Sequence, residues 1–175
     1  ATGKRRQLLA DAGRALGRGG GAGDVKTVLR QGEKSPLTIT VIREVISIQS
    51  VKARWLEPGF AYFRISAFQG DTGLEFRRQW QNLQAAASGV KTRGVVLDLR
   101  SNPGGLVNAA VEIADAFLPE AVVVSTKGRN ALANSTYYSK PGEQFGGLPV
   151  AVLIDAGSAS ASEILAGALQ DHKRA

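Results

Sequence analysis

The stretch LIDAGSASASEILAGALQDHKRA, residues 153–175, decides the fold that we predict for this chain. An apolar run ending at residue 154 indicates a strand, small residues at 157–162 indicate a turn, and Leu, Ile and Ala then recur at helical spacing. A serine in such a turn can expose its hydroxyl, while the helix N-terminus offers N–H groups to an oxyanion. The same serines fit helix capping, because Ser160 and Glu163 match the S-x-x-E capping box. The stretch alone leaves catalysis and capping open.

A second strand-turn-helix pattern occurs earlier in the chain. GVVLDL at 94–99 is nearly continuously apolar, as in a strand covered on both faces, and it ends in RSNPGG at 100–105 before helical spacing returns at 106–118. This repetition predicts an α/β layered core with largely parallel strands, whose functional groups gather at the carboxyl ends of the strands. The two glycines can expose N–H groups to an anion, or they can simply form a tight loop. We expect the two turns to face one pocket.

The other segments carry weaker periodic patterns. Strands are expected at 25–30, 37–43, 51–55, 60–66, 121–125 and 150–154, helices at 4–18 and 72–87, and a polar connection at 128–147. Phe76 and Trp80 lie one helical step apart, so we expect them in the core rather than in a ligand site.

Composition excludes several classes of protein. The chain has no cysteine, which excludes disulfides, cysteine-ligated zinc and thiol nucleophiles, and its single histidine, His172, is the only candidate base for a triad. No apolar run approaches the roughly 20 residues of a transmembrane helix. The net charge of +7 is partly concentrated in the first twenty residues, where a solvated basic face is expected because motifs of nucleic-acid binding are absent. No cofactor, metal or nucleic-acid partner is expected.

The chain contains no methionine and begins Ala-Thr-Gly-Lys, so we interpret it as a fragment of a longer protein. The lack of a signal peptide in it then carries no information on export.

Four segments together resemble the carboxy-terminal processing, or tail-specific, serine proteases. They are YFRISAFQGDT at 62–72, VVLDLRSNPGGL at 95–106, YYSKPGEQF at 137–145 and GSASASEILAGALQDHKRA at 157–175. The resemblance implies a partial PDZ-like α+β module over 1–46 and, over 47–175, a layered crotonase/ClpP-like protease core without its C-terminal part. It further implies a protein or peptide substrate with an unstructured C-terminus, and an extracytoplasmic, periplasmic location.

The resemblance also implies a set of site residues. Ser160 would be the nucleophile, and the oxyanion would be held by the backbone N–H of Ala161 and by one from Gly104 or Gly105, of which Gly104 is favoured. Helix capping would then fall mainly to Ser158 or Asp155, with Glu163 helping.

The base of such enzymes is a lysine, in a Ser-Lys dyad, and the resemblance implies that it lies beyond residue 175, so we predict that this polypeptide alone is inactive. Asp171 corresponds to a supporting aspartate, but it lies eleven residues after Ser160, about 16 Å along a regular helix. His172 and Lys173 are equally distant and are not expected to act as the base. We expect His172 to face solvent at the end of the helix.

Two other functions remain open at this stage. A non-catalytic peptide-binding or scaffold protein could have lost the base, and a crotonase-like acyl-thioester enzyme also uses backbone N–H groups at glycine-rich turns. An exposed edge of the truncated sheet could also pair between chains in a homo-oligomer.

Overall fold

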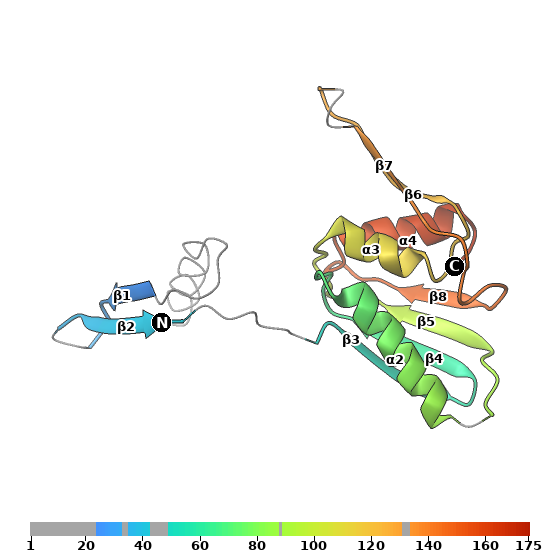
Figure 1. The fold of residues 1–175 in the computed structure, drawn as a ribbon, viewed down its shortest axis with the longest axis horizontal. Coiled ribbons are helices and arrows are strands. Elements are labelled where there is room, and N and C mark those ends of the chain that lie inside the picture. Colours follow the sequence, from blue (N-terminus) through green and yellow to red (C-terminus); the bar gives the residue numbers. More distant parts are fainter. Residues whose placement is uncertain (1–23, 33–34, 43–48, 88, 131–133) are drawn as a thin grey trace. The chain divides into compact units, whose positions relative to one another are not determined.

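A computed structural model describes residues 24–32, 35–42, 49–87, 89–130 and 134–175 (Figure 1). The chain divides into two compact units, residues 1–48 and 49–175. In the first unit, β1 (Asp24–Val28) and β2 (Leu37–Val41) confirm the strands predicted at 25–30 and 37–43, and they pair antiparallel. The predicted helix at 4–18 and the predicted domain boundary at 46–47 lie outside the described residues.

A four-stranded mixed sheet forms the centre of the second unit, in the order β3-β4-β5-β8. Its strands are β3 (Val51–Glu57), β4 (Phe60–Ile65), β5 (Gly94–Asp98) and β8 (Val150–Leu153). The strands β4, β5 and β8 run parallel to one another, as expected, whereas β3 runs antiparallel to β4. The reason is the tight Pro58-Gly59 turn, which reverses the chain with Gly59 at φ 92°.

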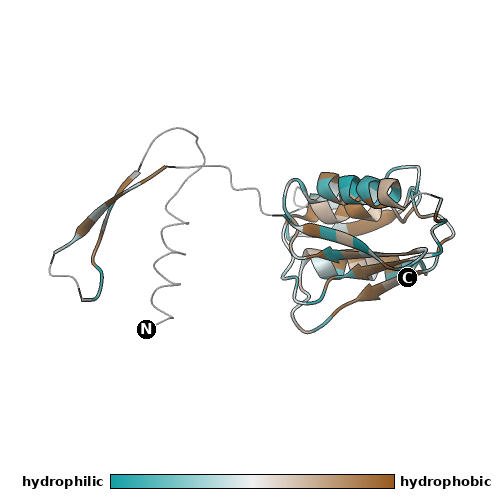
Figure 2. Ribbon diagram, turned by 90° about the horizontal axis from the view of Figure 1, so that it is seen from below, coloured by the Kyte–Doolittle hydropathy of each residue, from teal (hydrophilic) through white to brown (hydrophobic). Residues whose placement is uncertain are grey.

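Three helices share one hydrophobic core with this sheet: α2 (Thr72–Ala86), α3 (Val107–Ala114) and α4 (Ala161–Asp171). Helix α2 packs on β3 and on α3, and α3 packs on α4. Strand alternation sends Ala61, Phe63 and Ile65 of β4 into the core, where each is fully buried. Phe76 and Trp80 of α2 are 1% and 4% exposed, which confirms that they belong to the core. Figure 2 shows hydrophobic residues concentrated in the strands of this sheet.

A separate two-stranded ribbon, formed by β6 (Val122–Thr126) and β7 (Ser135–Tyr138), extends away from the helices (Figure 1). The strand near 121–125 was expected, whereas only a polar connection, without a strand, was expected over 128–147, where the structure has β7. The STYY segment of β7 has the β-branched and aromatic residues that favour strands, and it forms its ladder with β6 alone, so most of its side chains remain exposed.

The chain between β7 and β8 has no regular structure but is firmly anchored. Phe145 is fully buried and contacts four other aromatic rings, namely those of Phe63, Phe76, Trp80 and Phe117. The guanidinium of Arg174 donates hydrogen bonds to the backbone carbonyls of Phe117, Phe145 and Leu148. These contacts fasten the segment that leads into β8 to the end of α4.

Candidate active site

Two turns meet at the carboxyl ends of the neighbouring parallel strands β5 and β8. The first, residues 99–106, leads from β5 into α3, and the second, residues 154–160, leads from β8 into α4. They are joined directly, because the backbone carbonyl of Asn102 accepts hydrogen bonds from the Ala159 N–H and the Ser162 hydroxyl, each at 3.0 Å. The structure thus brings the two predicted turns together.

Ser160 stands at the junction of its turn with α4 in a conformation unusual for a residue with a side chain. Its φ is 55° and its ψ is −116°, and its surface is exposed. A non-glycine residue held at positive φ indicates local backbone strain, which is frequent at functional sites. Strain of this kind at a strand-to-helix turn is also how some hydrolases present a nucleophilic serine.

The cap of α4 is the capping box of Ser160 and Glu163 that the sequence pattern predicts, and not the cap that the resemblance implied. Ser160 itself occupies the N-cap position, and the Glu163 carboxylate accepts a hydrogen bond from the Ser160 N–H at 2.7 Å. Ser158, which was expected to cap, instead donates its hydroxyl to the Leu99 carbonyl at 2.8 Å, and Asp155 binds Ser101. The prediction that Ser158 or Asp155 would cap this helix was wrong, because the side chains of both residues form hydrogen bonds with residues of the turn over 99–106 instead.

The turn over residues 99–106 (the glycine turn) lies against the turn over residues 154–160 (the serine turn) so closely that Gly104 has no room for a side chain. A Cβ atom on Gly104 would come within 2.6 Å of the Ala159 carbonyl oxygen, 2.7 Å of the Ser160 Cβ and 2.9 Å of the Ala161 nitrogen. Gly104 also has φ +97°. Glycine is therefore required there for both the backbone conformation and the close approach.

The three predicted oxyanion donors are not equivalent. The Gly104 N–H donates to the Asn102 side-chain oxygen at 2.9 Å. In the part of the chain that the structure describes, the N–H groups of Gly105 and Ala161 have no hydrogen-bond acceptor. The chain from Phe68 supports the glycine turn, since Phe68 donates to the Gly104 carbonyl and accepts from the Leu106 N–H, at 3.0 and 2.8 Å.

Asn102 connects these pieces, and sequence reasoning did not single it out. It is fully buried, and its side-chain amide donates to the Ile65 carbonyl at the end of β4 while accepting from Gly104. Together with its backbone carbonyl, one residue joins β4, the glycine turn and the serine turn. The available signal was a polar residue in a turn that directly follows an apolar strand.

Asp155 organises the start of the serine turn. Its carboxylate accepts hydrogen bonds from the Ser101 N–H at 2.6 Å, the Ser101 hydroxyl at 3.1 Å and the Gly157 N–H at 2.9 Å. These contacts, led by the Ser101 backbone N–H, lower the pKa of Asp155 from its ordinary value.

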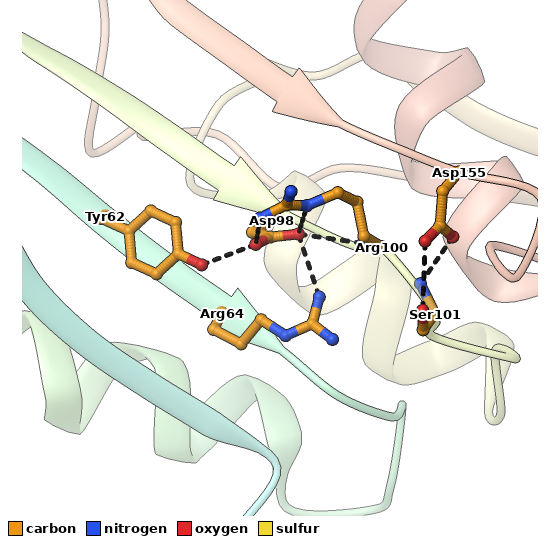
Figure 3. A pocket seen from close by; sticks show the side chains of 6 residues that line it. All are labelled: Tyr62, Arg64, Asp98, Arg100, Ser101 and Asp155. Atoms are coloured by element: carbon orange, nitrogen blue, oxygen red, sulfur yellow. Dashed lines mark hydrogen bonds and ion pairs between the residues drawn. The ribbon is translucent and has the colours of Figure 1, made fainter.

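Beside these turns lies an open pocket of about 380 Å³ that sequence reasoning missed (Figure 3). Its walls are Tyr62 and Arg64 of β4, Asp98 of β5, Arg100 and Ser101 of the following turn, and Asp155. Asp98 is buried at its centre. The hydrogen bond from Arg100, followed by that from Tyr62, lowers the pKa of Asp98 well below its usual range in spite of burial.

The same contacts change the partners of Asp98. Hydrogen bonding to Asp98 raises the pKa of Arg100, and burial, together with Asp98, raises the pKa of Tyr62. Asp98 is therefore held as a carboxylate and Arg100 as a cation throughout the physiological pH range.

The remaining candidate residues lie at the far end of α4. Asp171 is its last residue and is exposed, eleven residues from Ser160 and therefore about 16 Å away along the helix axis. His172 is exposed as expected, and its Nε2 lies 2.8 Å from the Val122 carbonyl of β6. Lys173 follows the helix. None of these three side chains can contact the Ser160 hydroxyl.

Two general features bear on cofactors and membranes. Within residues 24–32, 35–42, 49–87, 89–130 and 134–175, no three His, Asp or Glu side chains are grouped as a metal ion requires. Over the same ranges, the helices are too short or too polar to cross a lipid bilayer.

A mixed sheet with helices packed against it, and two turns that meet at the carboxyl ends of its parallel strands, places the second unit in the class of α/β proteins. Comparison with known sequences identifies the family within that class. The chain belongs to peptidase family S41, whose family model matches residues 59–175.

The chain is also similar in sequence to curated relatives that are named as carboxy-terminal-processing proteases. The chain is 42% identical over 149 residues to the carboxy-terminal-processing protease of Bartonella bacilliformis, a match that covers 85% of this chain and 34% of the relative. It is 38% identical over 152 residues to the carboxyl-terminal-processing protease of Synechocystis, again over 85% of this chain and 34% of the relative. The chain thus spans about a third of the length of these curated relatives.

Solved structures of proteases have a fold similar to that of this chain. The photosystem II D1 C-terminal processing protease superposes with a TM-score of 0.60 at 26% identity, covering 95% of this chain and 45% of that protein. A putative S41 protease from Bacteroides fragilis has a TM-score of 0.58 at 19% identity, covering 85% of this chain and 43% of that one, and shows likeness of fold alone.

Proposed function

We propose that this chain carries the nucleophile and the oxyanion-binding turns of a carboxy-terminal-processing serine endopeptidase. The observation that carries the proposal is the strained Ser160, exposed at the start of α4, with the glycine turn against its Cβ. In the proposed reaction, the Ser160 Oγ attacks the scissile carbonyl carbon and loses its proton to a base. Backbone N–H groups then hold the negative oxygen of the tetrahedral intermediate.

The proposed oxyanion donors are Ala161 and Gly105. Although the resemblance favoured Gly104, its N–H already donates to Asn102, whereas the N–H groups of Ala161 and Gly105 have no acceptor in the described part of the chain. An oxyanion needs donors about 3 Å away, and the loss of one donor typically lowers kcat by about 10²–10³-fold.

The proposed base is the lysine of a Ser-Lys dyad, from sequence that follows residue 175 in the longer protein. His172 is engaged with β6, and Lys173 lies beyond the opposite end of α4 from Ser160, so neither is suited to deprotonate the Ser160 hydroxyl. A serine hydroxyl without a nearby base is a poor nucleophile, so the 175-residue chain is proposed to be inactive by itself.

The substrates and the cellular setting are proposed from the names of the relatives. Because those relatives are named as carboxy-terminal-processing proteases, we propose protein substrates that are recognised by an unstructured C-terminal tail. Residues 1–46 would belong to a PDZ-like module that captures such tails, residues 47–175 would form a crotonase/ClpP-like protease core, and Asp171 would support that core. An extracytoplasmic, periplasmic location and homo-oligomer formation complete the proposal.

Hydrolysis of an unfolded, fluorescence-quenched peptide by the longer protein tests the proposal. We expect Ser160→Ala to lower kcat by at least about 10³-fold, because it removes the nucleophile. Ser125→Ala, on the exposed face of the ribbon, is the matched control and should leave kcat unchanged. Hydrolysis that survives Ser160→Ala would refute the nucleophile assignment. Turnover of an acyl-thioester would favour a crotonase-like enzyme, and binding without turnover would favour a scaffold.

A further inference from the structure

We propose that the pocket beside the two turns is a carboxylate-binding site for the polypeptide substrate, with Arg64 and Arg100 as the residues that contact the carboxylate. The identity of the ligand as a polypeptide rests on the proposed function. The ligand group itself is argued from the chemistry of the pocket.

A buried carboxylate fixes both arginines in place (Figure 3). Arg100 donates two hydrogen bonds to the Asp98 carboxylate, from Nε to Oδ1 at 3.0 Å and from Nη2 to Oδ2 at 2.7 Å. Arg64 donates from Nη1 to Oδ1 at 2.9 Å. The Tyr62 hydroxyl donates to Oδ2 at 2.6 Å. Because the Asp98 side chain is only 2% exposed, both guanidinium groups are oriented before any ligand arrives.

Each arginine keeps donors for a ligand. Among the residues that the structure describes, the Nε and Nη2 of Arg64 have no hydrogen-bond acceptor, and Arg100, which also interacts with the Tyr62 hydroxyl, has no carboxylate partner at Nη1. The side chains of Arg100 and Arg64 are 54% and 30% exposed, so these donors are accessible from the pocket. A planar carboxylate matches the paired N–H groups of a guanidinium.

The lining of the pocket is balanced in charge, with two arginines and two carboxylates, and the excess of positive charge beside it comes from the neighbouring strand β3. Arg64 and Arg100 share the buried carboxylate of Asp98, while the carboxylate of Asp155 is turned to the Ser101 and Gly157 N–H groups, from which it accepts hydrogen bonds. Neighbouring side chains on the same face of β3 are also basic: Lys52 lies opposite Arg64, and the Arg54 guanidinium lies 5.0 Å from the centre of the Tyr62 ring.

The pocket is continuous with the proposed catalytic turns. Ser101 and Asp155 line it; Ser101 belongs to the turn that contains Asn102, and Asp155 belongs to the turn that leads to Ser160. Both the pocket and the turns lie at the carboxyl ends of the parallel strands, where α/β proteins bind ligands. A polypeptide held at Ser160 would therefore bring a carboxylate a few residues from its reactive bond into the pocket.

A binding experiment with the Ser160→Ala protein tests the proposal without hydrolysis. The probe is a fluorescein-labelled, Ala- and Ser-rich decapeptide with one Asp and a free C-terminus, measured by fluorescence anisotropy at low salt. Two companion peptides replace the Asp by Asn or the C-terminal carboxylate by an amide. We expect one replacement to weaken binding about 10-fold, as for loss of a charge-assisted hydrogen bond, and that peptide identifies the source of the carboxylate.

Protein variants then assign the preference to the pocket. Arg64→Gln and Arg100→Gln should each remove the preference for the carboxylate peptide while leaving the affinity for its amide counterpart unchanged. Arg77→Gln, an exposed arginine of α2, is the matched control and should keep the full preference. If Arg100→Gln fails to fold, as judged by its unfolding transition, the preference of Arg64→Gln for the carboxylate peptide over its counterpart still tests the proposal.

No preference for either carboxylate, or a preference that both arginine variants retain, would overturn the proposal. Neither result depends on whether Ser160 hydrolyses peptides, so failure of the pocket and failure of the nucleophile assignment are distinguishable.

Discussion

Replacing Gly104 by alanine is the sharpest test of how the two turns meet. The new methyl carbon would lie 2.6 Å from the Ala159 carbonyl oxygen and 2.9 Å from the Ala161 nitrogen, distances that real Cβ atoms essentially never show. Both of these atoms belong to the backbone where the serine turn enters α4, so no flexible side chain can move aside. The serine turn or the glycine turn must shift as a whole.

Two contributions set the size of the effect. Holding a non-glycine residue at the Gly104 φ of +97° costs about 1 kcal/mol, and forcing an extra carbon into a tightly packed site costs about 1–3 kcal/mol more. We therefore expect the free energy of unfolding to fall by about 2–4 kcal/mol, which corresponds to a decrease in Tm of roughly 10 °C for a unit of this size.

Chemical and thermal unfolding of the variant, followed by circular dichroism, measure this loss. Gly142→Ala is the matched control, because Gly142 has a similar φ of +101° but a Cβ there would meet nothing within 4 Å. The control should cost only the backbone contribution of about 1 kcal/mol. Equal losses for the two variants would refute the close approach of the turns.

Three further predictions concern stability. Gly167→Ala, in the middle of α4 where a Cβ meets nothing within 4 Å, should raise the free energy of unfolding by about 0.5–1 kcal/mol in urea titrations. Asn102→Ala should lower it by about 2–4 kcal/mol, because the Ile65 carbonyl and the Gly104 N–H lose their partner, and a change below 1 kcal/mol in the same titrations would contradict the role of Asn102. For Asp98, whose folded pKa lies below its ordinary value of 3.8, the stabilisation from its ion pairs is fully present above about pH 4 and is lost as the pH falls toward the folded pKa. The urea midpoint of the wild type should therefore fall more steeply between pH 5 and about pH 2 than that of Asp98→Asn, and parallel curves would contradict this.

Much of the second unit could be predicted from periodicity. The apolar run at 94–99 and the helical spacing after 160 lie where the structure has β5 and α4, since both patterns depend on local burial alone. The antiparallel direction of β3 and the pairing of β7 could not be predicted in the same way, because a strand's partner is a tertiary property. Helix α3 ends at Ala114, earlier than the spacing to 118 suggested, although Phe117 and Leu118 continue the buried face in a turn.

The sequence predicted that the two turns would lie together, but not the hydrogen bonds between them. Turn chemistry and family resemblance indicated Ser160 and the two glycines, but the choice between Gly104 and Gly105 depends on where the Asn102 side chain points. The arginine pocket was missed because its residues are scattered in sequence and converge only when β4 and β5 pair in register, with Arg64 opposite Asp98.

The burial of Phe145 and the hydrogen bonds of Arg174 limit where residues can be inserted into this chain. Residues 139–148 are held at several points, since Ser139 exchanges backbone and side-chain hydrogen bonds with Ala121, and the Phe145 N–H donates to the Ala116 carbonyl. An insertion there would displace an aromatic ring from the core and release the carbonyls bound by Arg174. Added residues are far better accommodated at the distal end of the β6–β7 ribbon, which makes that end a natural place to attach a label, a tag or a further domain without moving Ser160.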